Sequence, residues 1–571
     1  MAIPFKWGSE LSIHDTIDIN SPESIAALSN GQFAVLRVTT TSDLFPALTF
    51  SVQILNADGS PDGSQHQIAT VDESHTAVFA SIAPLAGTGF LATWADVVTD
   101  GSDASATLMA LRYDFDGNPV GDPFAVSEPL VNVIQLGQVV ELADGGFAAA
   151  WGLNSGPSDE QSVFVRAIGS DGTPLGDATP VFVATATDTY KLDDLTALPG
   201  GGFVVVATHF AAASQTQVEI AILGGDGDLA TPTIALDPIY AGNESDAAVT
   251  ALADGRFAVT WMTANDAYTE AQIRAQIFEA DGTPIGGAFT VYDGGTPVFS
   301  GFPTITSLAD GGFVVAWFQT FDLGVTIEVD GQRYDADGNA VGAAFRVVSG
   351  HDEINTDLYS ATLADGRFVL IHGETADPIA GVGADQILAQ IFDPRTAGID
   401  HSGSGLDDQI VGTIFGDTLS GRSGDDFLWG EAGQDALYGG SGRDTIRGGT
   451  GNDLIDGGRK KDFLFGDAGG DLFVFDSKKD SRKKAADIIG DFDASEGDRI
   501  DLSGIDAKKG GHDNDFKFIG ASGFGGNKGE LKIVEKSSST IVKGDINGDG
   551  RADFAIKVKG VTTLHDDDFV L

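Results

Sequence analysis

The chain has 571 residues, a formal net charge of −51 and no cysteine. Its length exceeds what one hydrophobic core organises, so two or more domains are expected. The excess of carboxylates argues against nucleic acid and anionic membranes as partners, disulfides and thiolate metal sites are excluded, and no apolar stretch reaches the roughly 18 residues of a membrane span.

A hairpin-like phrase recurs seven times before residue 400, as in "LADGGFAAAW" and "LADGRFAVTW". Its marker phenylalanines are 54 to 57 residues apart: Phe33, Phe90, Phe147, Phe203, Phe257, Phe313 and Phe368. A second turn follows about 25 residues after each marker, Asp-Gly in six units and Asp393-Pro394 in the seventh. Asp-Gly between apolar runs favours a hairpin because glycine supplies positive φ. Four short strands in each of seven units predict a seven-bladed β-propeller over residues 1–400.

The seventh unit runs into the next segment without a fourth strand. The N-terminal "ELSIHDTIDIN" resembles the fourth strands of other units, such as "AFTVYDGG". We therefore expect residues 10–19 to complete the last blade.

Two features of the repeats are similar to binding sites but are expected to be structural. Trp94, Trp151, Trp261 and Trp317 each lie four residues after a marker phenylalanine, which favours packing between blades over a binding platform. The turns "DFDGN" (114–118) and "DADGN" (335–339) are similar to calcium loops but lack further acidic ligands, so we interpret them as hairpin turns.

Eight nonapeptides run without insertion from Gly403 to Val474, and an apolar residue always occupies position eight. Position six is always aspartate: Asp408, Asp417, Asp426, Asp435, Asp444, Asp453, Asp462 and Asp471. This period predicts turns and short strands of a parallel β-roll over 401–475, with two units in each coil and alternate units stacked on the same edge. Carboxylates stacked about 4.8 Å apart would repel one another, and Ca²⁺ bound between turns would remove the repulsion.

The units "GGSGRDTIR" and "GGTGNDLID" match GGxGxDxUx, so the array resembles the RTX repeats of secreted bacterial proteins. The best calcium loops are expected at 421–426, 430–435, 439–444 and 448–453. Besides the eight aspartates, the residues assigned to calcium in these loops are Gly421, Ser423, Gly424, Gly430, Ala432, Gly433, Gly439, Ser441, Gly442, Gly448, Thr450 and Gly451. Arg459, Lys460 and Lys461 interrupt the motif, and we expect that loop to bind calcium weakly or not at all.

The segment after the array resembles the C-terminal domain of the serralysin metalloproteases, and the resemblance covers about residues 403–571. A serralysin-like domain is therefore expected over 476–571. Within it Asp545, Asn547, Asp549 and Asp553 occupy positions 1, 3, 5 and 9 of an EF-hand-like loop, but Ile556 replaces the bidentate glutamate, so a calcium site and a tight turn remain equal alternatives. The acidic and apolar ending, Asp566–Leu571, resembles type I export signals, which implies an extracellular protein that uses type I secretion machinery.

A secreted protease is not supported, because no histidine is followed by glutamate and HExxH is therefore absent. Whether the chain is an enzyme stays open. The preferred hypothesis is an extracellular binding or adhesion module for polysaccharide or a cell-surface ligand, with a calcium-folded β-roll. The alternatives are a polysaccharide hydrolase or lyase with its site on the propeller, and a surface or matrix scaffold.

Overall fold

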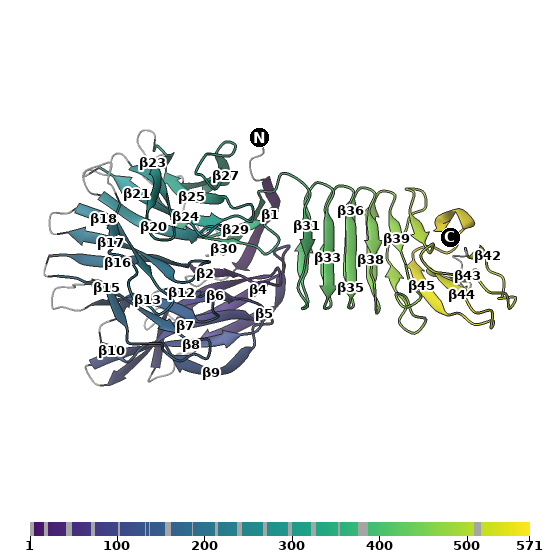
Figure 1. Ribbon diagram of the computed structural model, residues 1–571, viewed down its shortest axis with the longest axis horizontal. Helices are drawn as coiled ribbons and strands as arrows, with labels where there is room; N and C mark the ends of the chain where they lie inside the picture. The colour runs from purple at the N-terminus through teal and green to yellow at the C-terminus, as the bar shows by residue number, and fades with distance from the viewer. Residues whose placement is uncertain are drawn as a thin grey trace. The chain divides into compact units, whose positions relative to one another are not determined.

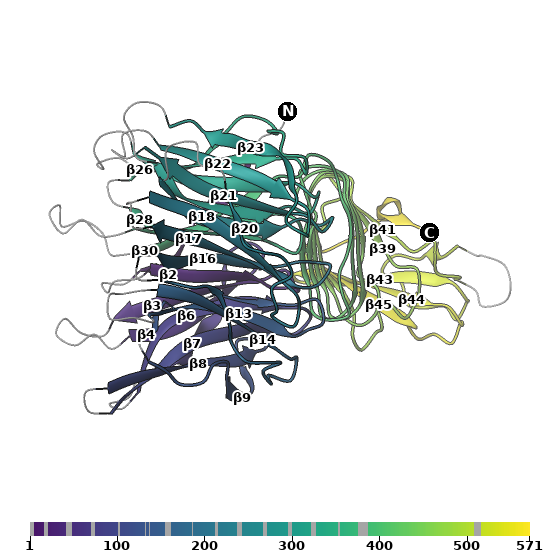
Figure 2. The ribbon, with the colours of Figure 1, turned by 60° about the vertical axis from the view of Figure 1, so that its left-hand side comes forward.

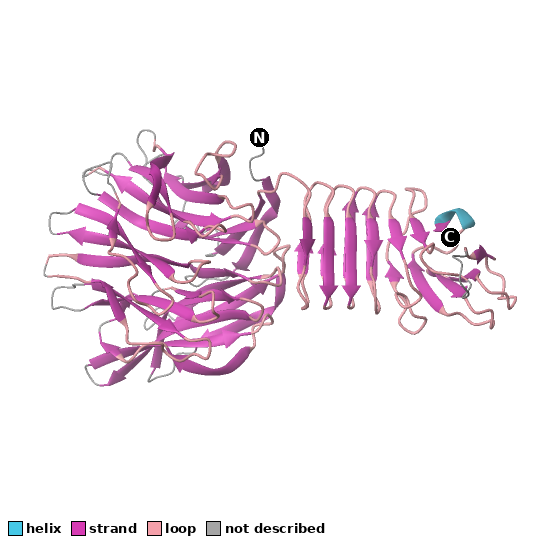
Figure 3. Ribbon diagram, in the orientation of Figure 1, coloured by secondary structure: helices cyan, strands magenta, loops and turns pink. Residues whose placement is uncertain are grey.

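The computed structural model describes residues 5–15, 21–40, 48–69, 75–100, 103–131, 133–135, 138–154, 161–185, 187–211, 215–236, 243–265, 271–294, 300–320, 327–351, 354–374, 386–507 and 515–571. The described residues are almost entirely strands and loops (Figure 3). They contain no helix long and apolar enough to cross a membrane. The chain forms two compact units, Met1–Pro394 and Arg395–Leu571.

The first unit is a propeller-like arrangement of small antiparallel sheets. Two sheets each take four consecutive strands: β2 (Ser21–Ala27), β3 (Phe33–Thr40), β4 (Leu48–Leu55) and β5 (Pro61–Ala69); and β24 (Ser300–Ser307), β25 (Phe313–Thr320), β26 (Ile327–Tyr334) and β27 (Phe345–His351). Two have five strands: β6 (His75–Leu85), β7 (Gly89–Asp100), β8 (Asp103–Tyr113), β9 (Pro119–Ala125) and β10 (Leu130–Val131); and β11 (Val133–Gln135), β12 (Val139–Glu141), β13 (Phe147–Asn154), β14 (Gln161–Ile168) and β15 (Thr179–Phe182).

A fifth small sheet joins the N-terminal strand to the last three strands of the unit. Its order is β1 (Phe5–Asp15), β30 (Gln386–Asp393), β29 (Phe368–Glu374) and β28 (Ile354–Thr362). β1 is antiparallel to β30, with Phe5 opposite Asp393 and Asp15 opposite Gln386. The strand thus begins nearer the N-terminus than the segment 10–19 named from the sequence, and residues 16–19 lie outside the described residues.

Seven separate four-stranded blades are not what the structure contains, and that expected count was wrong. Beside the five small sheets there is one of eight strands: β16 (Thr189–Ala197), β17 (Phe203–Ala211), β18 (Gln215–Leu223), β19 (Ile234–Ala235), β20 (Asn243–Ala251), β21 (Phe257–Ala264), β22 (Ala271–Phe278) and β23 (Pro284–Tyr292). Figure 2 shows β16, β17 and β18 beside β20, β21 and β22. Two repeat units merge here because Thr216 of β18 pairs in parallel with Asn243 of β20.

The core of the first unit lies between consecutive sequence repeats. Each of its seven hydrophobic clusters combines side chains of two neighbouring repeats. One of them joins Phe33 and Leu55 of the first repeat to Ile371 and Ile391 of the last, so the array closes on itself. Trp151, Trp261 and Trp317 are each 1% exposed, which confirms that these tryptophans pack rather than present a platform.

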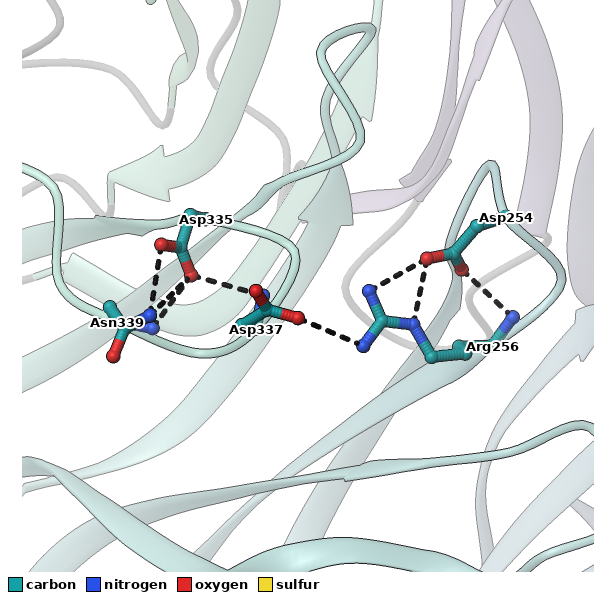
Figure 4. Close-up of polar contacts among 5 residues, drawn as sticks. All are labelled: Asp254, Arg256, Asp335, Asp337 and Asn339. Carbon is teal, nitrogen blue, oxygen red and sulfur yellow. Dashed lines mark hydrogen bonds and ion pairs between the residues drawn. The ribbon is translucent and has the colours of Figure 1, made fainter.

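Polar contacts between turns also join neighbouring repeats. Arg256, in the marker turn of the fifth repeat, contacts Asp254 (2.7 Å) and reaches Asp337 in the second turn of the sixth repeat (3.4 Å; Figure 4). Asp335 accepts the backbone N–H groups of Asp337 and Asn339 at 3.0 and 2.8 Å, which confirms a hairpin turn at 335–339. At the point of closure Arg367 donates to the carbonyl of Ala57 (2.6 Å).

The second unit consists of two parallel-stranded sheets that face each other, one of which ends in an antiparallel extension (Figure 1). One sheet has the order β31 (Asp400–Ser402), β33 (Thr418–Ser423), β35 (Ala436–Ser441), β37 (Leu454–Asp456), β39 (Leu472–Val474), β41 (Arg499–Asp501) and β46 (Phe569–Val570). The other has β32 (Gln409–Val411), β34 (Phe427–Trp429), β36 (Thr445–Thr450), β38 (Phe463–Ala468), β40 (Ile488–Ile489), β45 (Phe554–Lys559), β44 (Ser539–Asp545), β43 (Glu530–Lys536) and β42 (Lys517–Phe518). A short 3₁₀ turn, η1 (Asp566–Asp568), precedes β46.

The position-eight residues form the core of this unit. All eight, from Ile410 to Phe473, are at most 2% exposed and share one cluster with Ile489, Ile500 and Phe569. Both sheets continue past residue 475 into the C-terminal strands, so the boundary expected there lies inside a single compact unit.

Candidate metal centre

Two rows of loops connect the sheets of the second unit. The first edge consists of the turn segments that precede β32, β34, β36, β38 and β40, namely residues 403–408, 421–426, 439–444, 457–462 and 475–487. The second edge consists of the turn segments that precede β33, β35, β37, β39 and β41, namely residues 412–417, 430–435, 448–453, 466–471 and 490–498. The first three residues of the segments 421–426, 439–444, 448–453 and 466–471 are also the ends of β33, β35, β36 and β38. The expectation that alternate nonapeptides stack on the same edge is confirmed, because β34 pairs with β32 and β36 while β35 pairs with β33 and β37.

The aspartates of each edge form a hydrogen-bonded ladder. Each ladder aspartate donates its backbone N–H to Oδ1 of the next one along the edge. On the first edge these bonds run from Asp408 to Asp426, to Asp444, to Asp462 (each 2.9 Å) and on to Asp487 (3.0 Å). On the second edge they run from Asp417 to Asp435 (2.7 Å), to Asp453, to Asp471 and on to Asp498 (each 2.9 Å).

The second oxygen of most ladder aspartates has no donor. Within the described residues, Oδ2 is buried without a hydrogen bond in Asp426, Asp435, Asp444, Asp453, Asp462, Asp471 and Asp487. A buried carboxylate oxygen without a partner is costly. These atoms therefore fit a site in which a bound cation, rather than a hydrogen-bond donor, is the partner. Oxygen atoms from carboxylates and loop carbonyls are the ligands that Ca²⁺ prefers.

Burial raises the pKa of these carboxyl groups. Desolvation is the largest cause, and neighbouring carboxylates of the same edge add to it. The pKa is raised to about 6 for Asp426, about 7 for Asp444 and Asp471, about 8 for Asp435 and Asp462, and about 9 for Asp487. In the folded ladder without a cation, the ionised form of these carboxyl groups is therefore disfavoured. A bound dication would favour the ionised form.

The position-one glycines leave the space that these oxygens use. A Cβ built on Gly439 would lie 2.5 Å from Oδ2 of Asp444 and 2.7 Å from the carbonyl oxygen of Gly457. Both oxygens border the same small space, and the geometry repeats for Gly430 and Gly448 with their own aspartates and carbonyls. The residues present therefore fit a calcium ion held by ladder carboxylates and loop carbonyls. Among the described residues no group of three or more Asp, Glu or His side chains is gathered as a metal cage, so backbone oxygens would have to complete each site.

The remaining residues assigned to calcium lie in these loops at positions three and four. Ser441 is paired with Arg459 of the next coil, and Ala432 with Thr450 of the next coil. The carbonyls of Ser441 and Thr450 each accept the N–H of a position-four glycine, Gly424 and Gly433. A carbonyl has two lone pairs, so one acceptor site remains on each.

Lys460 occupies a backbone position that suits glycine. It has φ +91°, in the left-handed region, and Gly424, the position-four residue two coils earlier on the same edge, has φ 125°. Its Nζ lies 3.7 Å from Oδ1 of Asp425 in the neighbouring loop.

Replacing Lys460 with glycine should stabilise the second unit by about 1 kcal/mol, because the left-handed conformation costs a residue with a Cβ about that much. Lys461 has no such backbone angle, so Lys461→Gly removes the same charge without relieving strain and should not stabilise. Urea denaturation of both variants in millimolar calcium measures the difference. Equal stability of the two would contradict the strain argument.

The first two nonapeptides differ from the others in their hydrogen bonds. Oδ2 of Asp408 accepts the N–H of Ser404 (2.6 Å), and Oδ2 of Asp417 accepts that of Thr413 (2.5 Å). Both carboxylates thus have hydrogen-bond donors on Oδ2, which fits the beginning of a solenoid better than a cation site.

Two ladder members were missed by the sequence analysis. Asp487 and Asp498 continue the ladders, but 25 and 27 residues after their predecessors instead of 18. The nonapeptide period ends before them. A shorter signal, aspartate followed two residues later by a buried aliphatic residue (Ile489 and Ile500), could have found both.

The EF-hand-like loop is satisfied by its own backbone. Asp545 accepts the N–H groups of Gly548 (2.7 Å) and Gly550 (2.8 Å) on its two oxygens, and Asp553 accepts those of Ile546 (2.9 Å) and the Asn547 side chain (3.3 Å). Asp549 accepts the N–H of Arg551 (2.9 Å). These contacts favour the tight-turn alternative over a calcium site.

The first unit contains an ionic cluster that no sequence pattern indicated. Lys191 on β16 lies 3.2 Å from Asp193 and 3.1 Å from Asp246. Desolvation raises the pKa of Asp193 to about 6, and Thr208 donates to its other oxygen (2.5 Å). The rarity of lysine before residue 459, with only Lys6 and Lys191, was the available signal. The cluster joins neighbouring repeats, which is a structural role.

One comparison with known proteins matches the second unit and the end of the first. The family model of the peptidase M10 serralysin C-terminal domain matches residues 376–571. This part of the chain therefore carries a serralysin-type C-terminal domain, a kind of domain that binds calcium. A search of curated proteins finds no match to the chain.

Solved structures resemble the chain only weakly. A protein of unknown function from Dyadobacter fermentans is 12% identical, with 69% of this chain and 99% of that chain covered and a TM-score of 0.41. The AlgE6R3 subunit of the Azotobacter vinelandii mannuronan C5-epimerase is 26% identical, with 29% and 80% covered and a TM-score of 0.19. An α-L-arabinanase of Penicillium chrysogenum is 15% identical, with 55% and 94% covered and a TM-score of 0.36. At these TM-scores the similarities indicate no activity.

Proposed function

We propose that this is a secreted calcium-binding protein of the RTX type, whose second unit folds when calcium fills the ladders. The observation that carries the proposal is the row of buried, donor-free Oδ2 atoms from Asp426 to Asp487. Where calcium is scarce, the ladder carboxylates repel one another and oppose folding. At extracellular calcium, about 10⁻³ M, sites with dissociation constants of about 10⁻⁴ to 10⁻³ M would fill, and binding would drive folding.

The serralysin-type domain supports export by a type I secretion system, with the signal near the C-terminus. In the structure the C-terminal residues are part of the fold, since Phe569 in β46 pairs with Ile500 and is 3% exposed. Export before calcium-driven folding would leave this segment accessible to the secretion machinery.

For the first unit we propose an extracellular binding or adhesion role. Its closed, propeller-like array and its acidity support a stable display module: residues 1–394 contain 10 Lys and Arg against 51 Asp and Glu, a net charge of 10 − 51 = −41. The buried acids Asp193 and Asp194 are engaged by Lys191 and by the N–H of Val249 (2.7 Å), so their contacts favour structure over catalysis.

Calcium titration of the full chain tests the proposal. Amide hydrogen exchange should show residues 395–507 unprotected in chelator and protected above about 1 mM calcium, while the strands of residues 21–374 stay protected in both. Magnesium at the same concentration is the control, because it accepts the irregular, carbonyl-rich coordination poorly. Equal protection of the second unit in chelator and in calcium would refute calcium-driven folding.

A further inference from the structure

The two edges of the second unit carry opposite charge. Apart from the ladder aspartates, the first edge has ten cations and four acids, a net charge of 10 − 4 = +6. The second edge has no lysine or arginine and five acids, a net charge of −5. The ten cations are Arg422, Arg443, Arg459–Lys461, Lys478, Lys479 and Arg482–Lys484, and we call them the basic edge.

The basic edge lies in adjacent loops of one row. The N–H of Gly442 donates to the carbonyl of Arg459 (3.1 Å), and the N–H of Arg443 donates to Asp425 of the preceding loop (2.8 Å). The last loop, 475–487, follows directly, because its Asp487 accepts the N–H of Asp462 (3.0 Å). Since neighbouring strands are about 4.8 Å apart, the cations form a row along the stacking direction.

Most of these cations are available to a partner, although Lys483 Nζ donates to the carbonyl of Ala552 (3.2 Å) and Lys461 Nζ lies 4.5 Å from the centroid of the Phe463 ring. All of them except the half-buried Lys461 are exposed. Only Lys460 among the ten has a carboxylate of the described chain within 4 Å, at 3.7 Å from Asp425. In a chain of charge −51, nine cations without such a partner are not explained by internal ion pairing.

The insertion at the end of the ladder strengthens the pattern. The step from Asp462 to Asp487 is 25 residues, seven more than the regular 18. The lengthened loop carries five of the ten cations. On the second edge the charged residues of the lengthened loop 490–498 are all acidic. The charge difference is thus built into both insertions and into the regular loops.

We propose that the basic edge docks a linear polyanion, an acidic polysaccharide with carboxylate or sulfate groups along its length. A row of cations in stacked loops suits an extended chain with repeated charges, and displacement of counterions would drive the association. A second copy of this protein is the weaker candidate, because its own acidic second edge has only five acids outside the ladder to oppose ten cations. The proposal names a partner class for the extracellular protein proposed above, and it requires the second unit to be folded.

The test measures binding of the full-length protein to immobilised dextran sulfate in 2 mM calcium, with uncharged dextran as the reference, over about 50–300 mM salt. Dextran sulfate supplies linear anionic charge. The test variant replaces Lys478, Lys479, Lys483 and Lys484 with glutamine. The matched control replaces Lys517, Lys528, Lys536 and Lys559, which are exposed elsewhere in the same unit, and changes the net charge equally.

The wild type and the control should bind dextran sulfate and not dextran. The test variant should bind about tenfold more weakly and with a shallower salt dependence. No binding by the wild type, or equal weakening in both variants, would overturn the proposal. So would a loss of self-association, measured by sedimentation, in the test variant with unchanged polymer binding, which would assign the basic edge to a second copy. Hydrogen exchange on the same samples shows whether calcium folded the second unit, so failure of calcium-driven folding is recognised separately.

Discussion

Replacing Asp444 with asparagine is expected to move the midpoint of calcium-induced folding to about tenfold higher calcium, yet to leave the calcium-free protein as stable as the wild type or more so. Oδ1 of Asp444 accepts the N–H of Asp426 at 2.9 Å, and asparagine keeps that acceptor. Oδ2 is buried without a donor and would become an amide nitrogen, which cannot bind calcium. A loss of one carboxylate ligand costs affinity only where the ion binds.

The effect without calcium follows from the charge of the ladder. Burial raises the pKa of Asp444 to about 7, so its ionised form is disfavoured in the folded, calcium-free unit. The neutral amide removes that penalty. It can also donate to the carbonyl of Gly457, which borders the same space as Oδ2. Without a cation a ladder aspartate therefore opposes folding, and with a bound cation it supports folding.

Asp417→Asn is the matched control, since it changes the same repeat position by the same atoms. Both oxygens of Asp417 accept N–H groups, Oδ1 from Ile399 (2.6 Å) and Oδ2 from Thr413 (2.5 Å). Its replacement should destabilise the fold without removing a ligand, so stability at saturating calcium should fall, and the calcium midpoint should rise only by the amount that this loss of stability accounts for. Circular dichroism during calcium titration gives the midpoints, and urea unfolding at saturating calcium gives the stabilities. If Asp444→Asn behaved like Asp417→Asn, the ladder would be a hydrogen-bonding device rather than a cation site.

The residues that hold these ladders were predictable to the extent that they follow a fixed period. The nonapeptide frame predicts which aspartates share an edge and which aliphatic residues are buried, because one coil contains two units and every coil repeats the same backbone. It does not predict where the ladder ends. Asp487 and Asp498 take the same hydrogen bonds after insertions of different length, and only the fold brings them into line.

The first unit shows a second limit of prediction from sequence. Marker turns and strand order follow from Asp-Gly hairpins, and the buried tryptophans follow from their fixed offset. The merging of two repeats into an eight-stranded sheet depends on one backbone pair, Thr216 with Asn243. Neither residue type marks such a pairing. Likewise, the cluster of Lys191, Asp193 and Asp246 needs two neighbouring repeats to meet before its charges are close.

The sign of the pH dependence should reverse when calcium is added. In the unfolded chain aspartates titrate near pH 4, whereas in the calcium-free folded ladders the pKa is raised to about 7 for Asp444 and Asp471 and about 8 for Asp435 and Asp462. The folded state then binds more protons than the unfolded state. Its extra stability is fully present below about pH 4 and is lost as the pH rises through about 8.

With calcium the same carboxylates must be ionised to act as ligands, so protons compete with the metal and stability should rise with pH over about 5 to 7. The folded fraction of the second unit, measured by amide exchange of β34 to β38 at pH 5, 6, 7 and 8, gives both slopes. The calcium-free series is run in metal-free buffer, because chelators lose affinity in acid. The strands of the first unit provide an internal reference. Slopes of the same sign in the two series would mean that the buried carboxylates do not change from a repulsive row into a ligand set, and the calcium assignment would lose its physical basis.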